Sequence, residues 1–169
     1  MLVLHNHIPY VKRQGRWPFG EVWLFEAMAE TYIPFVATCN LLKEEGIKAP
    51  VTLGFSPTLL EQLNSSYIRR AFVEYLLERE KRAREDERYY ASVSDHHLAE
   101  LAAYYQRFYR DIRRTFLVDL DADIVNAVKC LQQDGDIELI TTAASHAYLP
   151  LLDRQSLKYQ VEWGKKAFE

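Results

Sequence analysis

The sequence predicts an α/β fold built on a parallel β-sheet. Three short segments have the length and apolar composition of buried strands, and they lie at residues 2–4, 49–55 and 136–142. A polar stretch containing a proline follows each of them, so each strand is expected to end there. Long helical patterns separate the three segments, and a strand–helix–strand order requires a parallel, right-handed crossover.

Composition excludes several classes of protein. The chain has 169 residues, of which 49% are hydrophobic and 27% are charged, as in a soluble globular protein of about one domain. The formal net charge of −3 provides no basic field for nucleic acid or anionic lipid. Neither a signal peptide nor an apolar run of membrane-spanning length is present, so we expect a cytoplasmic protein. The two cysteines, Cys39 and Cys130, are expected to be small core residues of helices in a reducing compartment.

Two histidines follow the first strand. His5 and His7 are two residues apart, so in extended backbone they point to the same side. The carboxyl ends of parallel strands are where α/β proteins bind ligands and collect catalytic groups. Imidazoles placed there could ligate a metal, bind sugar hydroxyls or shuttle protons, or they could simply cap the strand as partly buried residues.

An aromatic loop comes next. Residues 11–20 contain the breakers Gly15, Pro18 and Gly20 and are expected to form a loop. Trp17 in this loop could provide a platform for a sugar ring near the mouth of the sheet, or it could pack on the rim as a structural residue.

One long helix is expected over residues 21–45. Its apolar residues recur at three- and four-residue steps, and Gly46 follows as a stop signal. Pro34 lies inside this pattern and is expected to kink or split the helix.

A large helical insertion is expected at about residues 58–135. The pattern predicts three helices, the last beginning near Asp119 or Asp121 and ending at Gly135. The charged block at 78–88 mixes both signs, which indicates a solvated helix face. A simple crossover needs only about a dozen residues, so the insertion is expected to form a lid or groove wall.

The third strand brings another histidine to the same edge. His146 follows residues 136–142 and precedes Pro150, so it is expected at the mouth that holds His5 and His7. A final helix is expected to run to Glu169. Three parallel strands leave open edges and cannot close a barrel, so the pattern predicts the first part of a larger (β/α) barrel.

Five segments in order resemble glycoside hydrolase family 57, and most closely its 1,4-α-glucan branching enzymes. They are His-Asn-His-Ile-Pro-Tyr at 5–10, Trp-Pro-Phe-Gly-Glu at 17–21, Glu-Ala-Met-Ala-Glu-Thr-Tyr-Ile-Pro at 26–34, Thr-Leu-Gly-Phe-Ser-Pro at 52–57 and Ser-His-Ala-Tyr-Leu-Pro-Leu-Leu at 145–152. The resemblance implies that residues 1–169 are an incomplete, N-terminal portion of a distorted (β/α)7 barrel with a helical insertion after strand two.

The resemblance also implies a function. The family uses a retaining mechanism without a cofactor or metal ion, with a glutamate nucleophile on strand four and an aspartate acid/base on strand seven. Neither residue is in this chain, which is therefore expected to be inactive alone. The substrate-binding residues that carry over are His5, His7, Trp17 and His146. The implied partners are an α-1,4-glucan, in glycogen-type carbohydrate metabolism, and the rest of the chain's own barrel.

Other functions remain open. Within the same family the activity could be that of a 4-α-glucanotransferase or an amylase. A metal-dependent polysaccharide deacetylase-like barrel would use an HxH pair with an aspartate, for which Asp153 is the nearest candidate by sequence. A non-catalytic α-glucan-binding module would keep the aromatic sugar contacts without chemistry.

Overall fold

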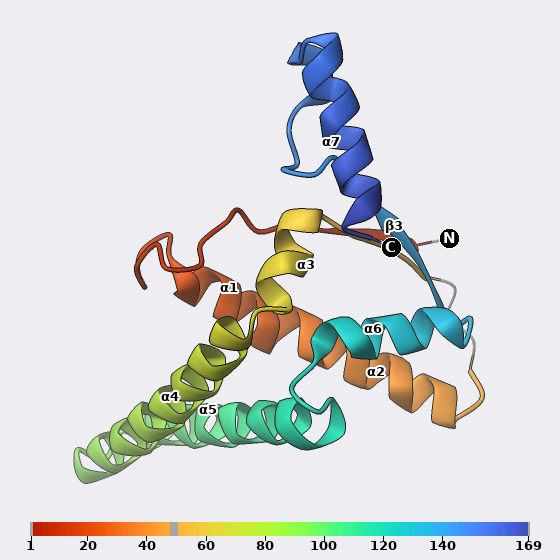
Figure 1. The fold of residues 1–169 in the computed structure, drawn as a ribbon. Coiled ribbons are helices and arrows are strands. Elements are labelled where there is room, and N and C mark those ends of the chain that lie inside the picture. Colours follow the sequence, from red (N-terminus) through yellow and green to blue (C-terminus); the bar gives the residue numbers. More distant parts are fainter. Residues whose placement is uncertain (1, 48–50, 169) are drawn as a thin grey trace.

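A computed structural model describes residues 2–47 and 51–168 (Figure 1). Its sheet contains strands β1 (Leu2–Asn6), β2 (Val51–Phe55) and β3 (Ile137–Thr141) in the order β1-β2-β3, and both pairs are parallel. The predicted α/β class with three parallel strands is confirmed. Strand β1 extends further than predicted, because His5 and Asn6 pair with Gly54 and Phe55. Residues 49 and 50 of the predicted second strand lie outside the described residues.

The long helix predicted after the aromatic loop is divided at a π-helical turn. Helix α1 spans Glu21–Ala27, the turn η1 spans Met28–Tyr32, and α2 spans Ile33–Glu44. Pro34 lies in the first turn of α2, where its missing N–H costs no helical hydrogen bond. The predicted split at the proline is confirmed, and the wider π turn absorbs the break without interrupting the helical path.

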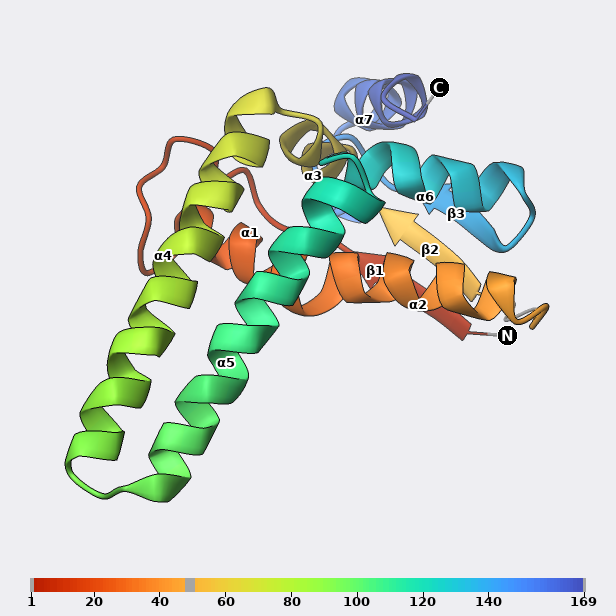
Figure 2. The same cartoon turned by 90° about the horizontal axis from the view of Figure 1, so that it is seen from below.

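Helices fill the segment between β2 and β3, as predicted. They are α3 (Pro57–Leu63), α4 (Ser66–Ser92), α5 (His96–Arg114), the π-helical turn η2 (Thr115–Asp119) and α6 (Ile124–Gln133). Helices α4 and α5 form an antiparallel hairpin that projects from the rest of the molecule (Figure 2).

Two details of this segment differ from the sequence prediction. Helix α3 was not predicted, although Ser56 caps it and Pro57 occupies its first position. Helix α6 begins later than expected, because the side chain of Asp123, rather than that of Asp119 or Asp121, accepts the capping hydrogen bond from the backbone N–H of Asn126. The charged block does lie on an exposed helix face, except that Glu80 and Ala83 are buried against α5.

After β3 a loop and a short 3-10 turn (Leu149–Leu151) lead into α7 (Arg154–Lys166). Asp153 caps α7 by accepting hydrogen bonds from the backbone N–H groups of Gln155 and Ser156. Asp153 thus has a structural role at a helix start. Figure 1 shows α7 projecting from the opposite face of the sheet to α2 and α6.

The hydrophobic core lies on one face of the sheet. Leu4 and Asn6 of β1 and Leu53 and Phe55 of β2 point toward α2 and α6, where they surround a small hollow of about 30 Å3. Alternation along the strands therefore directs His5, Gly54 and Ile140 to the other face. That face is open: Val3 is 51% exposed and Ile140 is 41% exposed.

One cysteine prediction is wrong. Cys39 is partly buried and packs against the core, but Cys130 is exposed. The buried stripe of α6 consists of Ile124, Val128 and Leu131, and Cys130 lies just off this stripe. No helix among residues 2–47 and 51–168 is both long and apolar enough to cross a membrane.

Candidate functional site

Three histidines meet at the carboxyl edge of the sheet. His5 is the fourth residue of β1, His7 follows the strand, and His146 lies in the loop after β3. The Nε2 atoms of His5 and His146 are 2.8 Å apart, which is a hydrogen bond in which one ring donates and the other accepts. The rings of His7 and His146 stack with centroids 4.0 Å apart. The structure therefore brings together residues that are about 140 positions apart in sequence, as predicted from their strand ends.

His7 is held by the strand next to its own. Its Nδ1 lies 2.7 Å from the hydroxyl of Ser56, a fully buried residue at the end of β2. Ser56 is itself fixed, because its N–H donates to the carbonyl of Asn6 and its hydroxyl accepts from the N–H of Leu59. Burial, and secondarily the nearby His146 and His5, lower the pKa of His7 below its usual value. His7 is thus neutral near pH 7 and offers one N–H donor and one nitrogen acceptor.

The loop that carries His146 is fixed from two sides. His146 has a φ of +57°, a left-handed conformation that a residue other than glycine adopts only when its surroundings impose it. Gln160 of α7 supplies the first restraint, because its side-chain carbonyl accepts from the N–H of Ser145 and its backbone carbonyl accepts from the N–H of Ala144. Thr58 of α3 supplies the second, by donating its hydroxyl to the carbonyl of Ala144 at 3.0 Å.

Helix α7 can approach this loop because residue 164 is glycine. A Cβ atom on Gly164 would lie 2.4 Å from the carbonyl oxygen of Thr142, well inside contact distance. The close approach places Gln160, one turn earlier in α7, within hydrogen-bonding distance of the loop. The backbone path of the His146 loop therefore depends on packing that no local pattern around His146 specifies.

Gly54 forms the floor beneath His5. It pairs with both His5 and Ile140 across the sheet, and a Cβ atom there would lie 3.3 Å from the Nδ1 of His5. Two residues earlier in each strand, on the same face, Thr52 donates its hydroxyl to the carboxylate of Glu138 at 2.6 Å. Glu138 thus lies one layer below the histidines and has a hydrogen-bond partner of its own.

A metal centre is not supported by the donors present. Within residues 2–47 and 51–168, no group of three or more histidine, cysteine, aspartate or glutamate side chains is arranged to hold a metal ion. The ring nitrogens of His5 and His146 hydrogen-bond to each other, so they do not converge on a common point. The described donor set therefore does not match the HxH-plus-aspartate centre of a deacetylase-like barrel.

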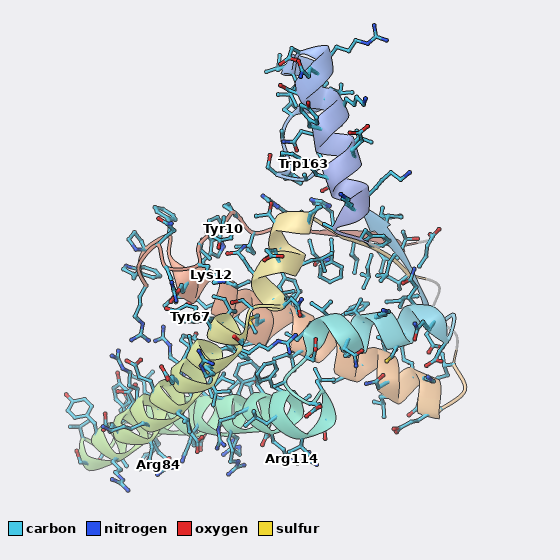
Figure 3. All side chains as sticks on the ribbon, viewed as in Figure 1. Tyr10, Lys12, Tyr67, Arg84, Arg114 and Trp163 are labelled. Atoms are coloured by element: carbon cyan, nitrogen blue, oxygen red, sulfur yellow. The ribbon has the colours of Figure 1, made fainter. Side chains whose placement is uncertain are left out.

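A buried amide anchors the segment that follows His7. The side chain of Gln62 in α3 is fully buried, and its carbonyl oxygen accepts from the N–H groups of Val11 and Lys12 at 2.7 and 3.2 Å. Its amide nitrogen donates to the carbonyls of Pro9 and Thr58 at 3.1 and 3.2 Å. Helix α3 therefore orients both His7, through its cap Ser56, and the exposed Tyr10 on the anchored segment. Figure 3 shows Tyr10 beside the sheet, on the segment that leads from β1 toward α1.

Trp17 lies apart from the histidines. It is 75% exposed on the loop between β1 and α1, which extends to the side of α1 away from α7 (Figure 1). Among the described residues, Trp17 makes no ring contact with His5, His7 or His146. The loop is fixed by Glu21, whose buried carboxylate accepts from the N–H of Arg13 and the hydroxyl of Tyr67. The structure thus confirms that Trp17 is exposed and does not place it in the histidine cluster.

The surface beside His146 is hollowed. A depression of about 460 Å3 is lined by His146 and neighbours on the same loop, including Thr142 and Tyr148. Tyr148 is 71% exposed, so its ring is free to contact a ligand. Sequence reasoning identified the three histidines and missed Ser56, Gln62, Gln160 and Tyr148. Three of these act through contacts with chain segments that are distant in sequence.

A comparison with family models matches residues 1–169 to "Glycosyl hydrolase family 57". The chain is 37% identical to the 1,4-alpha-glucan branching enzyme TK1436 of Thermococcus kodakarensis, over 99% of this chain and 24% of that protein. It is 28% identical to the probable 1,4-alpha-glucan branching enzyme Rv3031 of Mycobacterium tuberculosis, over 96% of this chain and 33% of that protein. The chain therefore spans a quarter to a third of the length of these relatives.

Solved structures give the same assignment. The family 57 branching enzyme of Pyrococcus horikoshii superposes with a TM-score of 0.93 at 40% identity, covering 99% of this chain and 31% of that one. The TK1436 structure, in complex with glucose and additives, gives 0.85 at 36% identity, with 99% and 30% covered. The α-amylase AmyC of Thermotoga maritima gives 0.84 at 27% identity, with 99% and 32% covered. The three parallel strands and their helices match the N-terminal part of the branching-enzyme structures. Both the family model and these superpositions thus extend over essentially all of the chain, which belongs to glycosyl hydrolase family 57.

Proposed function

We propose that this chain forms part of the catalytic barrel of a 1,4-α-glucan branching enzyme and supplies side chains that bind the glucan beside the reacting bond. The observation that carries the proposal is the cluster of His5, His7 and His146 at the carboxyl edge of a parallel sheet. The similarity of the chain to proteins described as branching enzymes supports the choice of activity.

The cluster suits a sugar ligand. One nitrogen of each ring is engaged within the cluster, and the other ring nitrogen can donate to or accept from a sugar hydroxyl. His7 is neutral near pH 7, and Ser56 fixes the orientation of its ring. The hydrogen bond between His5 and His146 fixes those two rings relative to each other. A glucosyl unit entering the hollow beside His146 would therefore meet polar groups that are already oriented, with Tyr148 as an exposed ring nearby.

The catalytic carboxylates would come from outside this chain. Retaining transfer between sugars needs two carboxyl groups about 5–5.5 Å apart, one as nucleophile and one as acid/base. Glu138 lies one layer below the histidines and accepts a hydrogen bond from Thr52, and Asp153 caps α7. In branching, the glucan held on the nucleophile passes to a 6-hydroxyl group of another chain, and these histidines would position the sugar during that transfer.

The rest of the barrel is the proposed partner of the open sheet face. Val3 and Ile140 are exposed on the face that carries His5, and neither β1 nor β3 has a second neighbouring strand among the described residues. Trp163, labelled on α7 in Figure 3, is 60% exposed. Its ring stacks on that of Tyr159. Further barrel strands and helices would cover these apolar surfaces and complete the site.

Incubation of the purified chain with amylose tests the assignment of roles. We expect no new α-1,6 linkages by proton NMR, because the proposal places the nucleophile and the acid/base outside this chain. In a complete barrel, His146→Ala is expected to lower turnover by at least tenfold while the denaturation midpoint stays within a few degrees, since His146 is exposed at the surface. Branching by the isolated chain, or unchanged turnover in the variant, would contradict the proposal.

Hydrolysis of α-glucan is the second candidate. The superposition on the α-amylase AmyC favours it, because the same strand and helix arrangement supports a protein described as an amylase. The two activities differ in whether water or a sugar hydroxyl accepts the glucosyl group. Release of reducing ends without new branches in the completed barrel would favour hydrolysis.

A further inference from the structure

A second hollow lies in the α4–α5 hairpin, in the half that is remote from the sheet (Figure 2). Its volume is about 290 Å3, and its lining includes Arg79, Arg82, Asp86 and Tyr90 of α4 together with Tyr105 and Tyr109 of α5. Figure 3 labels Arg84, which lies on α4 in the same half of the hairpin. The hairpin extends away from the histidine cluster, so this hollow is a separate feature of the surface.

Small residues keep the hollow open. Ala83 of α4 and Ala102 of α5 are both buried and both line it. Elsewhere the contact between the helices involves larger side chains, including the ion pair that Glu80 of α4 forms with Arg113 of α5. A leucine or phenylalanine at position 83 or 102 would occupy the space that the two alanines leave.

One wall is a fixed row of aromatic rings. Tyr105 stacks on Tyr109 with centroids 6.1 Å apart, and Tyr109 meets Tyr75 edge-on at 6.4 Å. Tyr75 in turn contacts the fully buried core residue Phe25, so the row is anchored in the hydrophobic core. Burial raises the pKa of Tyr109 to about 12, which keeps its hydroxyl protonated as a hydrogen-bond donor. Tyr105 is 42% exposed and presents a ring to solvent.

The polar groups around the hollow carry both signs of charge. Arg82 pairs with Glu78 at 2.6 Å, and the same carboxylate also pairs with Arg16. Arg79 lies 5.1 Å from the centroid of the Tyr75 ring. In the part of the chain that the structure describes, Asp86 forms neither an ion pair nor a hydrogen bond, so its oxygens are available as acceptors. Two arginines and one aspartate line the hollow and provide directed hydrogen bonds of both donor and acceptor type, which suits a polyhydroxylated ligand.

We propose that the hollow between α4 and α5 is a second α-glucan site, which holds a short stretch of the polymer away from the histidine cluster. The choice of an α-glucan as the ligand rests on the proposed function. The choice of this hollow as the site rests on its aromatic wall and polar rim. Exposed aromatic rings supply flat apolar area for sugar faces, and Asp86 and the arginines supply hydrogen bonds to hydroxyls. A site on the projecting hairpin would tether one part of a long glucan chain while another part lies at the histidine cluster. The tether would raise the local concentration of glucan at the cluster.

An NMR titration of the isotopically labelled chain with maltoheptaose tests this proposal. We expect backbone amides of residues 79–90 and 98–109 to shift saturably, and cellopentaose, which is β-linked, to leave them unchanged. Tyr105→Ala is expected to weaken this binding at least fivefold. The matched control is Tyr104→Ala, since Tyr104 is 53% exposed, against 42% for Tyr105, but does not line the hollow. If circular dichroism shows that Tyr105→Ala alters the fold, Asp86→Asn is the variant to use instead. It preserves the shape of the side chain and is expected to weaken maltoheptaose binding about twofold or more.

The outcomes separate the two sites. Hairpin amides that do not shift, or that shift equally in the Tyr104 and Tyr105 variants, would overturn the second site. His146→Ala should leave the hairpin shifts intact and remove those near β1 and β3. If maltoheptaose shifts amides near β1 and β3 but none in the hairpin, and His146→Ala removes those shifts, the result would support the proposed function alone. If it shifts hairpin amides but none near β1 and β3, the result would support the hairpin site alone.

Discussion

The buried amide of Gln62 provides the sharpest test of how the histidine site is held. Gln62→Glu keeps the shape of the side chain and removes its two N–H donors. The oxygen facing Val11 and Lys12 would still accept two hydrogen bonds, but the second oxygen would face the carbonyls of Pro9 and Thr58. Two donor–acceptor contacts would thus become acceptor–acceptor contacts in a fully buried position.

The cost follows from these four contacts. Each lost hydrogen bond that leaves a buried carbonyl without this donor costs about 1–2 kcal/mol. For two bonds we expect a loss of about 2–4 kcal/mol in the free energy of unfolding at pH 7, a large part of the stability of an ordinary domain. Burial and the facing carbonyls would raise the pKa of the introduced carboxyl in the folded state. The protonated carboxyl can donate one hydrogen bond. The loss of unfolding free energy should therefore be smallest at a pH below the pKa of this carboxyl in the unfolded chain, and it should be complete at a pH above its pKa in the folded chain.

Urea denaturation monitored by tryptophan fluorescence at pH 5 and pH 7 measures both effects. The matched control is Gln14→Glu, which introduces the same charge on the exposed loop after β1. We expect the control to change the unfolding free energy by less than about 0.5 kcal/mol. A loss below about 1 kcal/mol for Gln62→Glu at pH 7, or a loss that grows at pH 5, would refute the reasoning.

Two further predictions concern the residues around the cluster. The pKa of His7 is lowered in the folded state from its ordinary value of 6.5, so the unfolded chain binds more protons near and below that pH. Stability should therefore fall as pH drops through that value, by at most about 1.4 kcal/mol per pH unit for this one group. His7→Gln should reduce that slope in urea denaturation, whereas an unchanged slope would exclude His7 as its source. Gly164→Ala should cost about 1–3 kcal/mol, because its Cβ would lie 2.4 Å from the carbonyl oxygen of Thr142; an unchanged denaturation midpoint would show that α7 does not pack against that loop.

Local patterns were sufficient to predict the strands and the histidine edge. Each strand is a short apolar run followed by a proline, and the carboxyl ends of parallel strands share one edge, so His5, His7 and His146 could be placed together. The family was identifiable because five segments resembled it in order, and the comparison covers residues 1–169.

The supporting contacts were not predictable from such patterns. Gln62 is buried because backbone groups about 50 positions earlier surround it, and nothing in its own neighbourhood indicates this. Helix α3 was missed because Ser56-Pro57 was interpreted only as a strand end, although serine followed by proline is also typical of a helix start. Cys130 was assigned to the core on its apolar character, but the narrow buried stripe of α6 excludes it.

The imidazole nitrogen signals of the three clustered histidines, followed during a maltoheptaose titration, test the central claim most directly. The measurement is best made on the Tyr105→Ala chain, in which maltoheptaose binding at the hairpin hollow is expected to be weakened. The exposed His96 and His97 serve as internal references. We predict that the signals of His5, His7 and His146 shift together with a single dissociation constant while those of His96 and His97 stay fixed. Signals that remain unchanged in the cluster, or that shift equally in all five histidines, would contradict the account.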